Sequence, residues 1–545
     1  MAPHADSPTV GHEADRLPAI PRPAMSQNPP RILIIGAGSR GFAYARATQE
    51  STNGIVVAVA EPIASKRKRM GETYIWGKAG PADGQEFENW NQFAAWEQER
   101  RARAARGEDV PEGVDAAFIC ILDEMHKEVI LGLAPLGLHI MCEKPLATTL
   151  DDCVSIYKAM LPNLPDTTPS KIFGIGHVLR YSPHNMLLRK LLLEEKVIGE
   201  VMSINHTEPV GWWHFTHSYV RGNWRKESTT APSLLTKSCH DIDLLLWLLC
   251  SPPTGSTKPA HIPTQLSSTG ALQYFNKSRK PTAAADATNC LSCPIEKSCK
   301  YSAKKIYLGD QLKGLGSGNT NWPVDIVVND IEECVTKGGH SAGEAAVLSK
   351  LEEDYTKDTP TSKISSKNWF GRCVYESDND VCDDQVVTLK WENEPLLGES
   401  DKEKALAGRG AKIAVFHMVA HTKKICERYS HIYGCGGEIY ADSENITVEN
   451  FITGEKTIYK PHIAKGGHGG GDDGLARQFI LAVDAVKNHG VSVEEAQRVH
   501  VGCSLEEVIR SHAMVFAAEQ ARLGKQVLDF PQWWSKEVEA NLVKA

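Results

Sequence analysis

The sequence predicts an α/β protein of two domains: a doubly wound parallel sheet first, then an α+β domain with an antiparallel or mixed sheet. Three observations carry this prediction. Short apolar runs alternate with helix-like segments up to about residue 165. Beyond that point strand-like segments follow one another without intervening helices. A glycine-rich loop also follows the first apolar run directly.

The first domain is expected to begin at Arg31, where RILIIG has the branched apolar residues of a buried parallel strand. Three further runs of this kind are GIVVAVAEP, DAAFICIL and HIMCEKP. Helix-like segments at 41–50 and 124–136 lie between them. We therefore assign 31–165 to the parallel sheet and its helices.

The second domain is expected over 166–535. Its predicted strands are FGIGHVLRYSP, EVMSINHTEPV, QVVTLKWEN, KIAVFHMVA and GEIYADSENITVENF. A stretch at about 251–365, rich in Ser, Thr, Pro, Gly and Lys, is interpreted as an insertion without a core of its own. Residues 1–30 carry many prolines and few large apolar groups, which predicts a disordered leader.

Composition excludes several functional classes. The 545 residues are 41% apolar and carry a net charge of −8, so a general nucleic-acid or anionic-membrane binder is not expected. The apolar run LLLWLLC is far too short to span a bilayer. Fourteen cysteines in a chain of this length do not suggest a disulfide scaffold, which favours the cytoplasm.

The glycine loop has the pattern G-x-G-x-x-G between a predicted strand and a predicted helix, as in dinucleotide-binding domains. Gly36 would allow the tight turn, Gly38 the approach of the pyrophosphate, and Gly41 close packing of helix on strand. The first helical turn, with Ser39 and Arg40, would offer free N–H groups to the phosphates.

Glu61 ends the second predicted strand, where a carboxylate accepts hydrogen bonds from ribose hydroxyls and repels a 2′-phosphate. It therefore favours NAD. The basic run that follows, Lys66 to Arg69, is the alternative feature and would grip the 2′-phosphate of NADP.

Glu143, Lys144 and Pro145 end the fourth predicted strand, at the sheet edge where ligands of open α/β sheets bind. The proline holds Lys144 extended, and its charge would stabilise an alkoxide or relay a proton near the nicotinamide. A plain surface lysine at a strand end is the alternative.

Several motifs together resemble the glucose–fructose oxidoreductase and inositol dehydrogenase family (Gfo/Idh/MocA): IGAGSRG, CEKPLATTLDD, GHVLRYSP, KSCHDIDLLLWLL and GGHGGGDDG. The resemblance implies a Rossmann domain and a C-terminal α+β domain with a large open sheet. It also implies reversible oxidation of a sugar or polyol hydroxyl with NAD or NADP, catalysed by Lys144 and His240. A homodimer or homotetramer is typical of such proteins.

His240 lies three residues before Asp243 on one helix face, so a carboxylate is expected near the imidazole. A histidine that simply packs or caps its helix is the alternative. The family often has an aspartate four residues before this histidine, where the chain has Thr236, followed by Lys237. The substrate residues that the resemblance implies are His177, Arg180, Tyr181, Lys237, Asp243 and His468, with an internal ion pair as the alternative for Arg180.

Three cysteines within ten residues lie in the predicted insertion: Cys290, Cys293 and Cys299. This spacing suggests thiolate ligands of a structural zinc ion. Cys373 is the preferred fourth ligand, with Cys334 and His340 as alternatives. An iron–sulfur cluster and a loop with incidental thiols are the other interpretations.

The sequence thus predicts an NAD(P)-dependent oxidoreductase that acts on a small sugar or polyol. An NAD-dependent glycosidase that oxidises, eliminates, rehydrates and reduces is a second hypothesis. A catalytically silent NAD(P) sensor that binds another protein is a third, since Thr236 replaces the usual aspartate.

Overall fold

The computed structural model describes residues 11–13, 20–161, 170–253, 256–463 and 467–543. Its N-terminal part is a parallel sheet in the order β4-β3-β2-β5-β6-β7. The strands are β2 (Arg31–Ile35), β3 (Ile55–Ala60), β4 (Glu86–Phe87), β5 (Ala116–Ile119), β6 (His139–Cys142) and β7 (Phe173–Ile175). The helices between them are α1 (Ser39–Ser51), α2 (Ala64–Tyr74), α3 (Trp90–Ala105), α4 (His126–Leu133) and α5 (Leu150–Met160). The predicted doubly wound sheet is confirmed.

The segment FGIGHVLRYSP differs from its prediction as a strand of the second domain. Only Phe173–Ile175 is a strand, and it pairs in parallel with β6 of the first sheet. Residues 178–181 form a 3₁₀ turn instead. All three residues of β7 are buried, as a strand covered on both faces requires. The parallel sheet therefore continues past the predicted boundary at 165.

The second sheet has ten strands in the order β1-β15-β14-β13-β12-β8-β11-β10-β9-β16. The strands are β1 (Gly11–Glu13), β8 (Val201–Pro209), β9 (Gln265–Ala271), β10 (Asp384–Trp391), β11 (Lys412–Val419), β12 (Tyr429–Gly434), β13 (Gly437–Ala441), β14 (Ile446–Asn450), β15 (Lys456–Tyr459) and β16 (Leu528–Asp529). Within the described part of this second sheet, only β8–β11 and β1–β15 pair in parallel, which confirms the mostly antiparallel sheet. Every second residue of β10 is buried, so one face packs and the other stays open.

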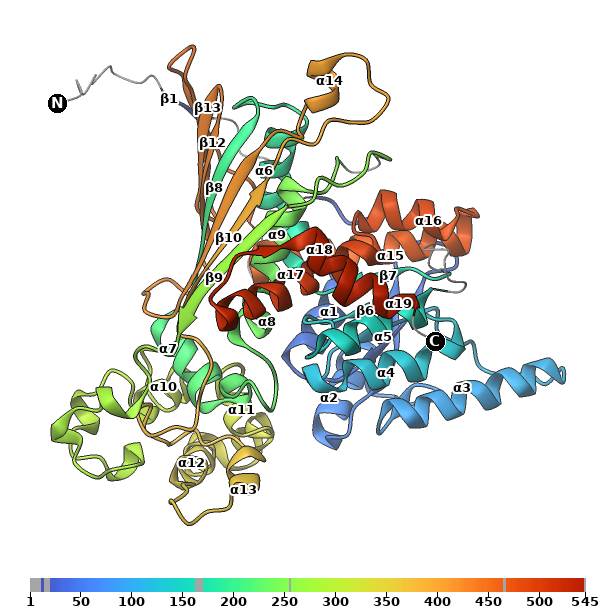
Figure 1. Cartoon of the computed structure of the whole chain (residues 1–545). Helices are drawn as coiled ribbons and strands as arrows, with labels where there is room; N and C mark the ends of the chain where they lie inside the picture. Colours follow the sequence, from blue (N-terminus) through green and yellow to red (C-terminus); the bar gives the residue numbers. More distant parts are fainter. Residues whose placement is uncertain (1–10, 14–19, 162–169, 254–255, 464–466, 544–545) are drawn as a thin grey trace.

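Helices cover the face of the large sheet that is turned towards the first domain (Figure 1). They include α6 (Pro183–Leu193), α9 (Cys239–Leu249) and α17 (Leu505–Gly524), whereas α15 (Gly471–His489) packs against α1 of the first domain. Every residue of α9 is buried, in keeping with its apolar sequence. The ring of Phe479 in α15 lies 5.4 Å from that of Phe118 in β5, so the C-terminal part also packs against the parallel sheet. This packing holds the C-terminal part of the chain against the parallel sheet of the first domain.

The insertion is placed differently from its prediction at about 251–365, because β9 lies inside that range and belongs to the large sheet. The inserted segment follows β9 and ends before β10 (Figure 1). Its helices are α10 (Ala303–Tyr307), α11 (Val324–Val327), α12 (Ile331–Glu352) and α13 (Thr361–Ser365). Contrary to expectation it has its own small core, which includes Ile306, Val324 and Val347. These apolar residues are scattered among many polar ones, so the composition of the stretch did not predict a core.

The predicted disordered leader has ordered contacts where the structure describes it. Strand β1 pairs with β15. Arg22 Nε donates to the carbonyl of Thr52 at 2.7 Å, and Ser26 Oγ donates to Asp484 at 2.7 Å. Residues 1–10 and 14–19 lie outside the described part. Within the described part, we find no helix with the length and apolar character needed to cross a bilayer.

Candidate active site

The glycine loop joins β2 to α1 with the geometry that a dinucleotide loop needs. Gly36 has φ +93°, and a Cβ there would lie 2.3 Å from the carbonyl oxygen of Cys120. A Cβ at Gly41 would lie 1.9 Å from the oxygen of Gly36, so helix and loop are in close contact. A Cβ at Gly38 would meet no atom within 4 Å, so this position faces open space. No side chain caps the N-terminus of α1, which leaves its first N–H groups available to an anion.

Two alanine substitutions should separate packing from ligand approach in this loop. Gly41→Ala should destabilise the fold by about 1–3 kcal/mol, because its Cβ overlaps backbone. Gly38→Ala should leave the melting temperature unchanged and weaken NADH binding by at least about tenfold, or ~1.4 kcal/mol. Calorimetry and fluorescence titration with NADH measure the two effects. Wild-type affinity in Gly38→Ala would contradict the assignment of this loop to the phosphates.

Glu61 follows β3 and is almost fully buried beside the glycine loop. Its carboxylate accepts the N–H of Ala37 at 2.7 Å and that of Ile63 at 2.8 Å. A carboxylate has about four acceptor positions, so two remain for hydroxyl donors such as those of a ribose. In the basic run that follows, Arg67 bonds Glu86 at 2.8 Å and Arg69 pairs with Glu332 of the insertion. Both arginine side chains are therefore engaged within the protein.

An ionic bridge links the loop to the end of β6 and to the start of α15. Arg40 Nε lies 2.7 Å from Glu143, and its terminal nitrogens lie 2.8 and 3.1 Å from Asp472. Tyr44 donates to the same Glu143 oxygen at 2.8 Å. Burial opposes ionisation of Glu143, but Arg40 and Lys144 outweigh it, and the pKa of Glu143 is lowered. The side chains of Arg40 and Glu143, both predicted to bind cofactor, thus bind each other and position the loop.

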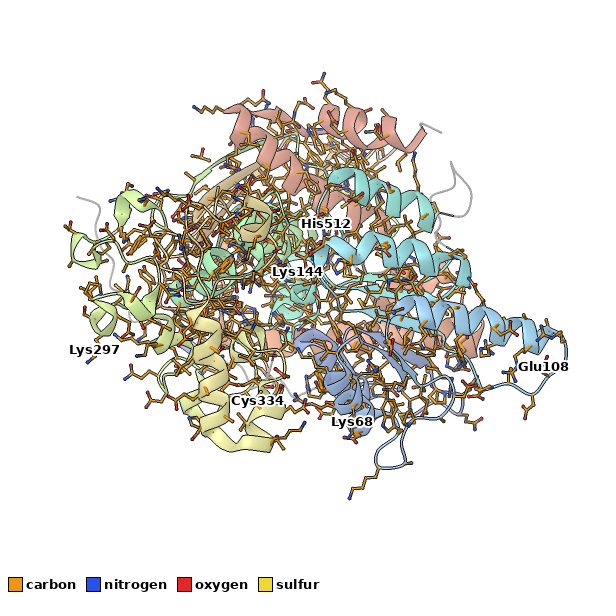
Figure 2. The ribbon with its side chains drawn as sticks, turned by 90° about the horizontal axis from the view of Figure 1, so that it is seen from below. Lys68, Glu108, Lys144, Lys297, Cys334 and His512 are labelled. Carbon is orange, nitrogen blue, oxygen red and sulfur yellow. The ribbon has the colours of Figure 1, made fainter. Side chains whose placement is uncertain are left out.

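Lys144 lies in the middle of the molecule, where the two domains meet (Figure 2). Its Nζ donates to the carbonyl of Thr236 at 2.8 Å and lies 5.8 Å from the ring centre of Trp224. Trp224 in turn donates from its indole nitrogen to Asp123 at 2.8 Å. The lysine thus leaves the carboxyl end of a parallel strand and contacts the turn just before His240. Substrate-binding edges of open α/β sheets are built in this way.

His240 is the second residue of α9 and is buried. Its Nδ1 has no hydrogen-bond partner among the described residues. Burial first, and then the charge of Lys144, lower the pKa of His240 well below its usual value. The imidazole is therefore neutral at neutral pH and offers a buried nitrogen that can accept a proton. Its ring centre lies 5.8 Å from that of His177 and 6.2 Å from that of His468.

These two neighbouring histidines have different surroundings. His177 is fully buried, and its Nε2 lies 3.3 Å from Ser511 Oγ. Burial lowers the pKa of His177 to about 3. His468 is one-third exposed, and its Nδ1 lies 3.1 Å from Asp472. His468 has φ +54° and lies in the glycine-rich turn directly before α15. This position brings its ring close to that of His240.

Three of the predicted substrate residues are bonded within the core instead. Arg180 and Asp243 form a bidentate ion pair with distances of 2.7 and 2.8 Å, and both are buried. Tyr181 donates to the carbonyl of Val501 at 2.8 Å. The carboxylate that the helix spacing placed near His240 is thus taken up by Arg180, and it also lies 3.7 Å from His177 Nε2. The internal ion pair left open by the sequence is the arrangement observed.

Lys237 belongs to a separate charged cluster on the large sheet. Its Nζ lies 3.0 Å from Glu208 and 2.9 Å from Cys426 Sγ. Arg428 pairs with the same Glu208 at 2.9 Å and with Asp241. Although burial disfavours the charge, Cys426 and Glu208 raise the pKa of Lys237. Its ammonium is therefore satisfied inside the protein.

Several residues near Lys144 and His240 were not predicted as site residues. Asp472 stands in the GGHGGGDDG motif, and only that motif signalled it. His512 stacks on His177 with ring centres 5.3 Å apart, and its Nε2 accepts the N–H of Leu146 at 2.8 Å. Asp123 and Trp224 come from segments with no recognisable pattern. Contacts between such distant segments leave no local sequence signal.

The four predicted metal ligands Cys290, Cys293, Cys299 and Cys373 all line one cavity in the insertion. The alternatives Cys334 and His340, on α12, are not among its lining residues. Within the described residues, no group of three or more His, Cys, Asp or Glu side chains has the arrangement of a metal site. The four cysteines therefore line one cavity without standing as a formed metal site, and the predicted zinc has no support from the comparisons with known proteins.

Those comparisons match the chain in two successive parts. Residues 30–161 match "Oxidoreductase family, NAD-binding Rossmann fold", and residues 190–274 match "Oxidoreductase family, C-terminal alpha/beta domain". A 2,7-anhydro-N-acetylneuraminate hydratase of Escherichia coli is 30% identical over 136 residues, 25% of this chain and 34% of the relative. An inositol 2-dehydrogenase/D-chiro-inositol 3-dehydrogenase of Shouchella clausii is 25% identical over 221 residues, 40% of this chain and 53% of the relative. The matches thus span one-third to about half of these curated relatives.

Solved structures resemble the chain over nearly its whole length. An inositol dehydrogenase homologue of Azotobacter vinelandii, complexed with NAD⁺, has a TM-score of 0.56 and 13% identity. The alignment covers 92% of this chain and 98% of that one. At this level of identity the likeness establishes the fold.

Proposed function

The chain belongs to the Gfo/Idh/MocA family of oxidoreductases, and on that premise we propose that it transfers a hydride between a nicotinamide dinucleotide and a hydroxyl-bearing carbon of a sugar or polyol. One observation carries the proposal. Lys144, at the carboxyl end of a Rossmann strand, contacts the turn that precedes a buried, neutral His240 with an unpartnered Nδ1. A cation and a proton acceptor at the dinucleotide end of the sheet are what alcohol oxidation requires.

The residues of the glycine loop fit a dinucleotide. Gly38 leaves room for a pyrophosphate, and the uncapped start of α1 supplies donors for it. Glu61 would hold the ribose hydroxyls and favours NAD over NADP, because a second anion beside its buried carboxylate would be repelled. When bound there, the dinucleotide supplies the hydride acceptor.

The chain's own side chains would handle the proton and the charge. In the oxidising direction, the His240 imidazole accepts the substrate hydroxyl proton while the C–H hydride departs. The Lys144 ammonium stabilises the negative charge that develops on the oxygen. His177 and His468 stand beside His240 and would contact the rest of the substrate. In the reducing direction the same proton returns from His240 to the alkoxide.

Purified full-length protein should bind NADH more tightly than NADPH and form NADH with at least one member of a polyol and sugar panel. Failure to bind either dinucleotide would overturn the proposal. Because the Escherichia coli relative is named a hydratase, the assay should also measure dinucleotide released on denaturation. Tightly retained NAD with product formation but no net NADH would favour the redox-cycling alternative. Dinucleotide-dependent capture of a protein partner, without turnover, would favour the sensor.

We further propose that the protein works in the cytoplasm. None of its fourteen cysteines is in a disulfide, as expected of a protein from a reducing compartment. A homodimer or homotetramer through the open face of the large sheet remains part of the proposal. Fractionation and size-exclusion chromatography with light scattering would test the two points.

A further inference from the structure

The four cysteines of the insertion come from two segments, 290–299 and the loop with Cys373, and line one small cavity. The cavity measures about 20 Å³ and is lined by Cys290, Cys293, Cys299 and Cys373, with Arg221 and Glu296 beside them. A volume of this size holds about one water-sized species. Neither family match covers this part of the chain, since the second one ends at residue 274. The cluster therefore lies outside both family matches.

A backbone donor points at one of the sulfur atoms. The N–H of Ala303 donates to Cys290 Sγ at 3.4 Å. Donors of this kind orient sulfur ligands and stabilise their thiolate charge in metal sites.

A buried cation is the second, independent observation. Arg221 is 1% exposed, and its Nη2 lies 3.4 Å from Cys290 Sγ. Its other acceptors are the carbonyl oxygens of Arg372 and Tyr301, at 2.6 and 2.8 Å. No carboxylate of the described residues pairs with it. A buried guanidinium requires negative charge nearby, and the cavity offers thiolates for this, because the Glu296 carboxylate beside them bonds Ser302.

We propose that Cys290, Cys293, Cys299 and Cys373 bind one zinc ion in a tetrahedral four-thiolate site, with Arg221 offsetting part of its charge. Four thiols release four protons to solvent, and the resulting site has a net charge of −2 before Arg221 is counted. Because the cavity suits a single atom, a cluster of several iron and sulfide atoms is disfavoured. The ion itself would draw the sulfurs to about 2.3 Å, which metal-free side chains need not adopt.

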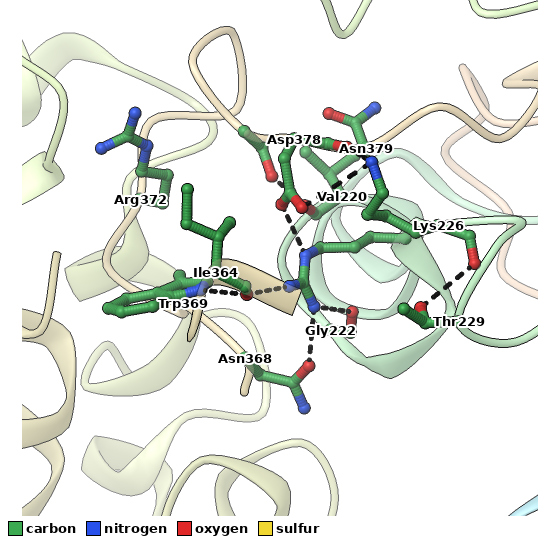
Figure 3. A network of polar contacts seen from close by, with 12 residues as sticks. Val220, Gly222, Lys226, Thr229, Ile364, Asn368, Trp369, Arg372, Asp378 and Asn379 are labelled. Atoms are coloured by element: carbon green, nitrogen blue, oxygen red, sulfur yellow. Dashed lines mark hydrogen bonds and ion pairs between the residues drawn. The ribbon is translucent and has the colours of Figure 1, made fainter. Parts of the chain in front are cut away.

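The site's position gives the metal a structural role. Arg221 ends the segment 212–221, and Trp224, which lies over Lys144, follows three residues later. A network of polar contacts connects the residues around 220–229 to the insertion (Figure 3). In it, Arg225 lies 2.7 Å from Asp378 and donates to Asn368 at 3.1 Å. The zinc site would thus fasten the insertion to the segment that carries one wall of the candidate active site.

Elemental analysis of the full-length protein, expressed with zinc and purified without chelators, tests the proposal directly. We expect about one zinc per chain and, by X-ray absorption, four sulfur neighbours at about 2.3 Å. Cys293→Ser should lower zinc retention at least about tenfold. Cys334→Ser, in the same insertion but away from the cavity, should retain the metal fully.

Each other outcome would overturn the proposal. These are zinc at less than about a tenth of an equivalent, iron with inorganic sulfide in its place, or wild-type zinc in Cys293→Ser. If Cys293→Ser does not fold, the absorption spectrum of the wild-type protein decides. Nitrogen or oxygen neighbours in place of four sulfurs would contradict the site. None of these measurements depends on turnover, so they stand apart from the test of the proposed oxidoreductase activity.

Discussion

Lys144→Met is expected to lower kcat by about 10²–10³ while NADH binding changes little. The ammonium group of Lys144 contacts Thr236, close in the chain to His240. Its charge should therefore act on the substrate oxygen that reacts, and not on the phosphates of the dinucleotide. Methionine keeps the length and the apolar stem of the side chain but removes the charge. Steady-state kinetics with the best substrate of the panel, together with NADH titration, would measure the two effects.

The matched control is Lys190→Met, an exposed lysine of α6 that pairs only with Glu195 among the described ion pairs. It should keep wild-type kcat. Melting temperatures of both variants would show whether Lys144 supports the fold instead. Wild-type turnover in a folded Lys144→Met variant would remove the lysine from the mechanism, and loss of NADH binding would make it a cofactor ligand.

The parallel sheet and the glycine loop were predictable because their signals are local. Apolar runs such as RILIIG need both faces covered, and the spacing of Gly36, Gly38 and Gly41 reflects one turn of chain. The family resemblance then supplied Lys144 and His240. The structure adds that Lys144 bonds the carbonyl of Thr236, four residues before His240, a contact that no local pattern contains.

The rest depended on long-range pairing. The spacing of His240 and Asp243 correctly indicated a shared helix, but not that Arg180, about 60 residues away in the chain, takes up the carboxylate. Likewise, β7 has three strand residues and gains its place only from pairing with β6. The bridge from Arg40 to Asp472 joins two residues that are 432 positions apart in the sequence. Partner choice of this kind is set by tertiary packing, which a single sequence does not display.

The pH dependence of His240 is the sharpest test of the proposed chemistry. Oxidation needs the neutral imidazole, because only that form accepts the hydroxyl proton. Burial and Lys144 lower the pKa of His240 well below the usual 6.5. As pH falls, kcat/KM for oxidation should therefore hold through pH 6.5 and decline only below it. An acid limb centred above pH 6.5 would contradict a buried, neutral base.

His240→Asn should lower kcat by about 10²–10⁴ and abolish that acid limb, because the group that titrates is gone. His489→Asn, at the exposed end of α15, is the matched control and should keep both the rate and the profile of the wild type. If His240→Asn keeps the acid limb at a reduced rate, another group accepts the proton and His240 only positions the substrate. His177 would be a poor replacement, because burial lowers its pKa to about 3 and its Nε2 faces Ser511. His468, one-third exposed and close to the ring of His240, would then be the next base to replace.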